Sequence, residues 1–307
     1  MEHDDALQVE ILNSRAAINN WRGGASENPE LHDKVIELTR RLYGEKDLRV
    51  AQALAARSLT YEMLSKSERA IEDRRAAIDM ITALTGAANP FLANDYLNLG
   101  ISFLTLHRFE EAKTAFEHAA ELQEGVTSAL LVNVNEGLVE AHLHTSPPEV
   151  TLAVVDKAID LARANGDEGM HEWSLHVQRA EALAQKGDFA GKAEECRKVL
   201  AVQEARGKAL PTAPYYPDAL NCIGEAELAL HQTKSGIAYL ERSVSMKTRY
   251  TANELPRVRF TLAKALRASG GELQRARDLA ENAREDLRTA QGCEAEVADI
   301  DKWLEAR

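Results

Sequence analysis

The sequence predicts an all-α protein in which pairs of helices repeat along the chain and stack into a solenoid. Alanine, leucine and glutamate dominate the 307 residues, and runs of valine, isoleucine and threonine that would form strands are scarce. Small and aromatic residues recur at a spacing of roughly 42 residues. Glycine and proline interrupt the helical patterns at intervals, where the chain would turn from one helix to the next.

The clearest pattern lies in residues 92–122, "LANDYLNLGISFLTLHRFEEAKTAFEHAAEL". Small side chains let two helices approach closely, and large ones fill the space that remains between them. The residues that set the pattern are the small Gly100, Ala112 and Ala119 and the large Tyr96, Leu99, Phe103, Phe109 and Phe116. The segment holds no catalytic motif, so its regularity indicates packing.

The same spacing recurs on both sides of this segment. Counting back 42 residues from Gly100, Phe103, Ala112 and Ala119 gives Ser58, Tyr61, Ala70 and Ala77, and later in the chain Gly224, Gly236 and Leu240 keep the internal spacings. We therefore expect contacts between helices at Ser58, Tyr61, Ala70, Gly100, Phe103, Ala112, Phe116 and Gly224.

The order of these residues resembles the signature of the tetratricopeptide repeat (TPR) family. Tyr96, Leu99, Gly100 and Phe103 match its first helix, and Ala112 and Phe116 match its second, although Glu124 stands where a proline is expected. The usual unit has ~34 residues, so a period near 42 adds about one turn to each helix, as in kinesin light chains. The resemblance implies a right-handed solenoid with the first helix of each pair on the concave side and the second on the convex side.

Seven helix pairs fit between the turn signals. The predicted pairs are 4–22 with 28–43, 47–64 with 67–85, 90–106 with 109–124, 127–144 with 148–165, 169–186 with 189–206, 215–231 with 234–250, and 253–269 with 272–290. The breakers that separate them are Gly23-Gly24, Gly44, Asn89-Pro90, Gly125, Pro147-Pro148, Gly166, Pro211 to Pro217, Gly270-Gly271 and Gly292. The first pair follows the pattern least clearly, and "EAHLHTSPPEV" departs from it at the turn of the fourth pair.

A final helix at about 294–306 would close the stack. Its apolar stripe of Val297, Ile300, Trp303 and Leu304 suits a helix with one face inward and acidic residues outward. We predict one continuous repeat domain with a degenerate hairpin at 1–46, TPR repeats at 47–292 and a capping helix at 293–307.

The residues with chemical potential do not form a catalytic or metal-binding motif. His142 and His144 are two apart and so lie on different faces of a helix, and no pair of histidines has the four-residue spacing of a helical metal site. Cys222 stands beside Gly224 at a packing position. We therefore predict no enzyme activity in this chain, no metal and no cofactor.

The net charge limits the kinds of partner that we expect, and the cysteines bear on the cellular location. A net charge of −12 argues against nucleic acid and against anionic membrane surfaces, and no apolar run is long enough to span a membrane. The three cysteines, Cys196, Cys222 and Cys293, are scattered and odd in number. We therefore expect no disulfide framework and a cytoplasmic location.

In the TPR register, four asparagines fall on or near the inward side of first helices. The resemblance implies that Asn94, Asn98, Asn135 and Asn221 hydrogen-bond the backbone of a bound peptide, and their alternative role is that of an ordinary polar helix surface. The lysine and asparagine set of carboxylate-clamp TPR proteins is not evident, which disfavours chaperone tails as ligands.

A second resemblance concerns the last 90 residues or so. The run "RVRFTLAKALRASGGELQRARDLAENAREDL" followed by "AEVADIDKWL" is similar to the TPR sensor regions of myxobacterial serine/threonine protein kinases. The chain has no kinase glycine-rich loop, no HRD and no DFG, so any kinase would lie on a missing part or another chain. The leading hypothesis is a scaffold that binds a protein or peptide in its concave groove. The alternatives are a regulatory domain that binds a small molecule there, and a homo-oligomer.

Overall fold

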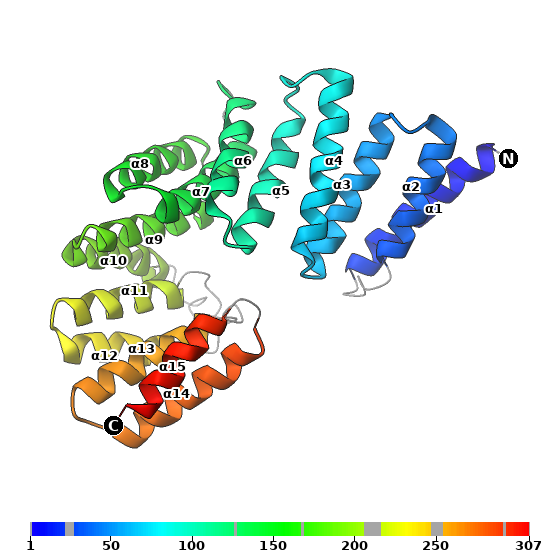
Figure 1. The fold of residues 1–307 in the computed structure, drawn as a ribbon. Coiled ribbons are helices and arrows are strands. Elements are labelled where there is room, and N and C mark those ends of the chain that lie inside the picture. The colour runs from blue at the N-terminus through cyan, green and yellow to red at the C-terminus, as the bar shows by residue number, and fades with distance from the viewer. Residues whose placement is uncertain are drawn as a thin grey trace. The chain divides into compact units, whose positions relative to one another are not determined.

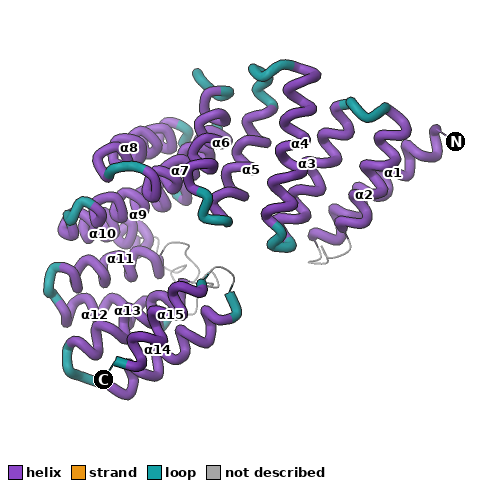
Figure 2. Tube along the Cα trace, viewed as in Figure 1, coloured by secondary structure: helices purple, strands orange, loops and turns teal. Residues whose placement is uncertain are grey.

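The computed structural model describes residues 2–21, 28–125, 128–166, 169–205, 216–246, 254–290 and 293–306, and in these ranges it has fifteen helices and no strand (Figures 1 and 2). The helices are α1 (Glu2–Trp21), α2 (Asn28–Tyr43), α3 (Leu48–Met63), α4 (Ser67–Thr85), α5 (Leu92–Thr105), α6 (Phe109–Glu121), α7 (Ala129–Thr145), α8 (Pro148–Ala164), α9 (Met170–Gln185), α10 (Phe189–Ala205), α11 (Tyr216–Ala229), α12 (Thr233–Val244), α13 (Glu254–Ala268), α14 (Leu273–Arg288) and α15 (Glu294–Glu305). The all-α helical-repeat class is confirmed. Of the predicted breakers, Gly23, Gly24, Pro211 and Gly292 lie outside the described residues.

The chain divides into two compact units. The first comprises Met1–Pro147 with Ala164–Gly166, and the second comprises Pro148–Arg163 with Asp167–Arg307. Within each unit, a second helix packs against the first helix of its own pair and against the first helix of the next pair, as α4 does with α3 and α5. The hairpins of the first unit follow one another in this manner in Figure 1.

One small residue in each odd-numbered helix from α1 to α13, which we call the first helices, marks the register of the repeats. These residues are buried or half-buried, and they are Ala16, Ser58, Gly100, Gly137, Ala180, Gly224 and Ala263. Seven residues after five of them, the backbone takes a left-handed conformation that ends the helix, at Ser65, His107, Gly187, His231 and Gly270. The repeat is therefore a repeat of backbone geometry as well as of composition.

A second-helix side chain fills the space beside these small residues. We call it the slot residue. It lies sixteen positions after the small residue and is buried in five of the seven repeats, as His32, Arg74, Phe116, Cys196 and Leu240, whereas Ala153 is exposed and Leu279 is half-buried at the same position of the other two. All five are buried, with at most 5% of the residue surface exposed. Their chemistry differs although their position is the same.

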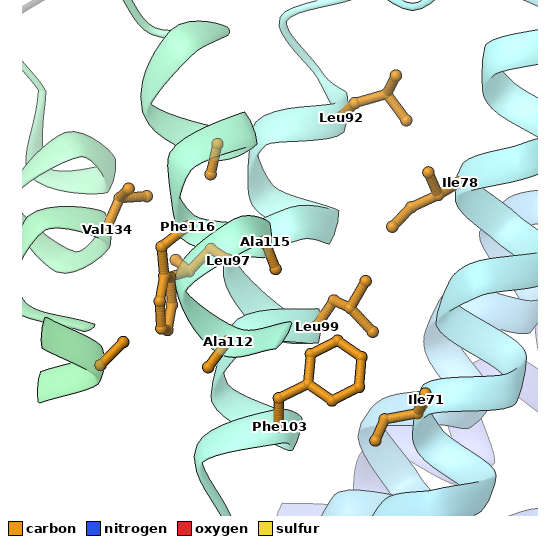
Figure 3. Close-up of a cluster of buried hydrophobic side chains, with 12 residues drawn as sticks. Ile71, Ile78, Leu92, Leu97, Leu99, Phe103, Ala112, Ala115, Phe116 and Val134 are labelled. Atoms are coloured by element: carbon orange, nitrogen blue, oxygen red, sulfur yellow. The ribbon is translucent and has the colours of Figure 1, made fainter. Parts of the chain in front are cut away.

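Phe116 is the clearest case (Figure 3). Its ring lies between α5 and α7, against the backbones of Gly100 and Gly137, and a Cβ atom added at Gly100 would stand 2.6 Å from the ring atom Cε1. Leu97 and Val134 lie close to the ring in the same core cluster. Only glycine leaves room for an aromatic ring this close to a helix backbone.

Helix α15 covers the end of the second unit. Ile300 is buried there against α13 and α14, and Trp303 meets Phe260 edge to face with ring centroids 5.6 Å apart. The guanidinium of Arg267 lies 3.7 Å from the Trp303 ring centroid and donates a hydrogen bond to the Trp303 carbonyl at 2.8 Å. The apolar stripe predicted for α15 therefore packs against α13 and α14 of the same unit.

The expectation of no disulfide is wrong. Cys196 of α10 and Cys222 of α11 form a disulfide with a Cα–Cα separation of 6.2 Å, and Cys293 is a buried cysteine outside that bond. Cys196 is a slot residue, and Cys222 lies on the first helix that the slot faces. An odd count of cysteines allows one bond and one free thiol, so the count alone could not exclude the pair.

No helix in the described part of the chain is both long enough and apolar enough to cross a membrane.

Candidate functional site

The first helices of the first unit present exposed aliphatic side chains in equivalent positions. Leu59 on α3 and Ile101 on α5 each follow the buried small residue of their helix and are 47% and 46% exposed. Met63, one turn beyond Leu59, is also exposed. These side chains lie on the face formed by α1, α3, α5 and α7, which we call the first-helix face.

Amide side chains lie on the same helices. Gln52 and Asn94 are exposed, occupy equivalent positions 42 residues apart, and precede Leu59 and Ile101 by two turns of helix. Amides can both donate to and accept from a peptide backbone. The combination of exposed aliphatic and amide groups can therefore contact both the side chains and the main chain of a polypeptide.

The four predicted asparagines divide between the two units. Asn98 on α5 and Asn135 on α7 hold equivalent positions, and their Nδ2 atoms donate to the carbonyls of Asn94 and Leu131 at 2.7 and 2.8 Å. Asn221 lies in the second unit, where its Nδ2 atom donates to Glu225 at 3.4 Å. The structure thus brings Asn94, Asn98 and Asn135 together on neighbouring helices, and Asn221 elsewhere. Their contact with a peptide stays a prediction.

A pocket of about 590 Å³ opens between α1 and α3 on the first-helix face. Its walls are largely apolar and include Val9 and Leu59, and α2 contributes Val35 and His32 from behind. Pockets that hold small ligands have volumes of roughly 300–1,000 Å³ and combine apolar walls with a few polar groups. This pocket therefore has the size and lining of a binding site.

His32 is one of two buried polar residues in this lining, the other being Thr39. His32 is 5% exposed, and its Nε2 atom lies 3.1 Å from the Thr60 hydroxyl of α3. Its Nδ1 atom is buried and has no hydrogen-bond partner among the described residues. Burial, and secondarily the charge of Arg57, lowers the pKa of His32, so the ring is neutral at pH 7.

Two charged residues, Glu10 of α1 and Arg49 of α3, line the pocket. Arg49 lies over the Tyr43 ring with its guanidinium carbon 4.0 Å from the centroid, and it forms an ion pair of 3.3 Å with Asp47. Asn13 and Gln52 line the pocket from opposite first helices. The lining therefore combines neutral amides with the Glu10 carboxylate, the paired Arg49 and the buried imidazole of His32.

The first helices of the second unit carry charged groups instead. Lys192 is 6% exposed and forms ion pairs of 3.2 and 3.0 Å with Glu181 on α9 and Glu225 on α11. Burial alone would lower the pKa of Lys192, but the two carboxylates outweigh it and raise that pKa. Glu181 and Glu225 directly follow the buried Ala180 and Gly224, as Leu59 follows Ser58. The equivalent positions are therefore aliphatic in the first unit and charged in the second, where Lys264 follows Ala263 in the same way.

A second buried ionic cluster lies behind these helices. The Glu195 carboxylate accepts from Lys198 at 2.6 Å, from His176 at 2.7 Å and from Arg179 at 3.0 Å. Burial of Glu195 would raise its pKa, but the hydrogen bonds from His176 and Lys198 and the charge of Arg179 outweigh burial and lower that pKa to about 2. The cluster joins α9 to α10 and explains how a buried carboxylate is kept charged.

Sequence analysis did not single out His32 or Lys192. His32 occupies the slot that Phe116 fills in another repeat, and Lys192 takes the place of Ala70, Ala112 and Gly236. If the repeats are aligned on the small residue of each first helix, His32 and Lys192 both stand out as ionisable residues at positions that are buried in other repeats.

Comparison with known proteins establishes the fold. No family model matches the chain, and no curated protein matches it. Among solved structures, a tetratricopeptide repeat protein from Parabacteroides merdae aligns over 97% of this chain and 98% of its own, with a TM-score of 0.67 at 11% identity. This chain has the TPR fold.

Two further TPR structures show the range of the similarity. The kinesin light chain TPR-like repeats of Podosopora anserina cover 67% of this chain and 98% of their own, with a TM-score of 0.58 at 14% identity. A signal transduction ATPase with numerous domains from Pyrococcus horikoshii, which has a tetratricopeptide repeat sensor, aligns over 96% of this chain and 44% of its own, with a TM-score of 0.59 at 12% identity. The predicted likeness to kinesin-light-chain repeats is therefore confirmed at the level of the fold.

Proposed function

We propose that the chain is a non-catalytic scaffold that binds an extended polypeptide segment on its first-helix face, the concave face of TPR repeats. The observation that carries this proposal is the exposed row of Leu59, Met63 and Ile101 in the first unit, accompanied by the amides of Gln52 and Asn94. Aliphatic groups would bury apolar side chains of the ligand, and the amides would hydrogen-bond its backbone.

An array of immobilised random peptides tests this function. We expect saturable binding of a subset of peptides that share apolar residues, and weaker binding when Leu59→Asp and Ile101→Asp are combined. Absence of any saturable peptide in several buffers would contradict the proposal.

A regulatory domain that binds a small molecule is the second candidate, and the pocket between α1 and α3 favours it. Thermal-shift screening against metabolite and peptide libraries separates the two, because each ligand raises the melting temperature of the protein that binds it. A role as the sensor region of a bacterial signalling protein is a further part of the proposal, and it is supported by the TPR sensor of the Pyrococcus horikoshii signalling ATPase.

Self-association is the third candidate. Helix α1 exposes Leu7, Ile11 and Ile18, each at least 51% exposed, and a second copy of the chain could cover them. Light scattering at two protein concentrations decides this point. A cytoplasmic location stays a proposal, and the Cys196–Cys222 disulfide weighs against it because such bonds are rare in reducing compartments.

A further inference from the structure

We propose that the pocket between α1 and α3 binds the amino terminus of the polypeptide ligand, with the terminal ammonium beside Glu10 and an apolar first side chain at the other end of the pocket. The inference rests on the proposed function and names the part of the ligand that the first repeat would recognise. It follows from the distribution of polar and apolar residues along the pocket, and from polar groups there that have no partner in the described part of the chain.

Contacts of α2 show which of its residues lie at which end of the pocket. Asn28, at the start of α2, donates to the Ala16 carbonyl at 3.0 Å, and Arg41, near its end, forms an ion pair of 2.6 Å with Asp5. Helix α2 therefore runs antiparallel to α1. Thr39, two residues before Arg41, lies toward the end where α1 begins.

The pocket is polar at this end and apolar at the other. Helices α1 and α3 hold equivalent places in consecutive repeats, so Gln52 is the equivalent of Glu10, and Arg49 lies nearly one turn closer to the start of α3. The polar lining residues at or near the end where α1 and α3 begin are Glu10, Asn13, Thr39, Tyr43, Arg49 and Gln52. The lining residues of α1 and α3 at the other end are Ala16, Ala17, Ala56 and Leu59.

The polar end has a negative charge without a counter-charge. Glu10 is exposed and lines the pocket, and it forms no ion pair with any residue that the structure describes. Arg49 pairs with Asp47 at 3.3 Å and lies over the Tyr43 ring, so its charge is already compensated. A cationic group of a ligand would gain an ion pair with Glu10 and would not have to displace another cation.

The Thr39 hydroxyl is a second acceptor without a partner. Thr39 is 2% exposed and lines the pocket, and its hydroxyl makes no hydrogen bond to a described residue. It is not one of the fully enclosed unpaired atoms, in contrast to His32 Nδ1, so a ligand in the pocket can reach it. A buried polar group without a partner is destabilising, so a ligand that donates a hydrogen bond there gains affinity.

An ammonium ion fits this set of groups. It has three N–H donors and no acceptor, so it can donate to the Glu10 carboxylate, to the Thr39 hydroxyl and to an amide oxygen of Asn13 or Gln52. A carboxylate would instead be repelled by Glu10 and would find Arg49 already paired. The ligand group expected at the polar end is therefore an ammonium.

A polypeptide carries ammonium groups at its amino terminus and on its lysine side chains. A lysine with its ammonium at Glu10 would place its own backbone at the apolar end, where Ala17, Ala56 and Leu59 offer no side-chain hydrogen bond. An amino terminus would place its first peptide groups beside Asn13 and Gln52, whose exposed amides make no hydrogen bond to described residues. The amino terminus therefore uses both ends of the pocket.

Calorimetry with five probes tests the proposal. The probes are the amidated peptides Leu-Ala-Ala-Ala-Ala, its N-acetylated form, Ser-Ala-Ala-Ala-Ala and N-acetyl-Ala-Ala-Lys-Ala-Ala, together with 3-methylbutylamine. We expect the free leucine peptide to bind about tenfold or more tightly than the two acetylated peptides, because only it has a terminal ammonium, and more tightly than the serine peptide, because its first side chain is apolar. Equal affinity of the free and acetylated leucine peptides, or no binding of the free one, would overturn the inference.

Three variants connect the effect to the pocket. Glu10→Gln should weaken binding of the free leucine peptide about tenfold or more, and Thr39→Val, which replaces the hydroxyl by a methyl group, about threefold or more. Glu110→Gln changes a glutamate of α6 whose side chain is 69% exposed, and it should leave the affinity unchanged, which excludes a general attraction to an acidic protein. Circular dichroism verifies each fold, and full affinity in a folded Glu10→Gln would contradict the proposal.

The probes also separate this inference from the proposed function. Ala17→Trp, at an exposed position of α1, should fill the apolar end of the pocket. If array peptides bind equally well when acetylated and are insensitive to Ala17→Trp, the terminus pocket is refuted while the scaffold function stands. If 3-methylbutylamine binds as tightly as the leucine peptide, the pocket takes free amines and the peptide source is refuted. If the leucine pentapeptide binds but no longer peptide binds more tightly, the pocket stands and the extended scaffold does not.

Discussion

At the scale of single residues, small and charged side chains stabilise the fold in different ways. Gly100 makes room for the Phe116 ring, so its importance is steric. Glu195 is buried, and its carboxylate contacts Lys198, Arg179 and His176, so its importance is electrostatic. Each effect leads to its own prediction.

Replacement of Gly100 by alanine should destabilise the protein by about 1–3 kcal/mol. The new Cβ would lie 2.6 Å from the Phe116 ring, and this overlap should outweigh the gain of about 1 kcal/mol in helix propensity. Gly271→Ala is the control for the steric effect, because a Cβ there would meet only the Ser269 hydroxyl, at an ordinary contact distance of 3.7 Å. Urea unfolding followed by circular dichroism measures both; equal stabilities of the two variants would contradict the packing account.

Glu195 should make the stability of the protein depend on acid pH. Because its pKa is lowered to about 2 in the folded chain from 4.5, the unfolded chain binds more protons as the pH falls. The contribution, up to about 3 kcal/mol, is complete above pH 5 and is lost as the pH falls toward 2. Glu195→Gln should lower stability at pH 7 and flatten the loss between pH 5 and pH 3.

Glu194→Gln is the control for this change, since Glu194 is adjacent in sequence and its side chain is 73% exposed. Its unfolding free energy should follow the wild-type protein at every pH. A Glu195→Gln profile that also parallels the wild type would remove the ionic cluster from the account.

At the scale of helices, spacing predicted most of what the structure contains. The pair predicted at 47–64 and 67–85 is observed at Leu48–Met63 and Ser67–Thr85. Turn residues and apolar periodicity determine such boundaries locally, so a single sequence carries them. The disulfide could not be predicted in this way, because it depends on which faces of two separate helix pairs meet.

The Cys196–Cys222 bond should stabilise the contact between α10 and α11. The cysteines are 26 residues apart, and a loop of this length corresponds to a stabilisation of roughly 3 kcal/mol from reduced chain entropy in the unfolded state. We therefore expect dithiothreitol to lower the melting temperature of the wild-type protein and to leave that of the Cys196→Ala/Cys222→Ala variant unchanged. An identical response of the two proteins to the reductant would show that the bond does not form.

At the scale of the whole molecule, the two units have first-helix surfaces of different character. The positions after the buried small residues include the aliphatic Leu59 and Ile101 in the first unit and are the charged Glu181, Glu225 and Lys264 in the second. The sequence pattern predicted the fold that carries these surfaces, because packing repeats along the chain. The predicted asparagine contacts and the single continuous repeat domain stay predictions.

The pocket beside His32 was beyond sequence reasoning for a physical reason. A cavity arises from what the neighbouring helices fail to fill, and that depends on the distances between three helices. The slot residue itself is visible in the sequence only after the register of the faint first pair is known.

The most direct test of the central claim, polypeptide capture on the first-helix face, is hydrogen exchange of the full chain with its tightest array peptide bound. The account predicts slower exchange in α3, α5 and α7, and at least tenfold weaker binding for Leu59→Asp/Ile101→Asp than for Leu84→Asp, which changes an exposed leucine of the second helix α4. Protection confined to the second helices, or an equal loss of affinity in Leu84→Asp, would contradict it.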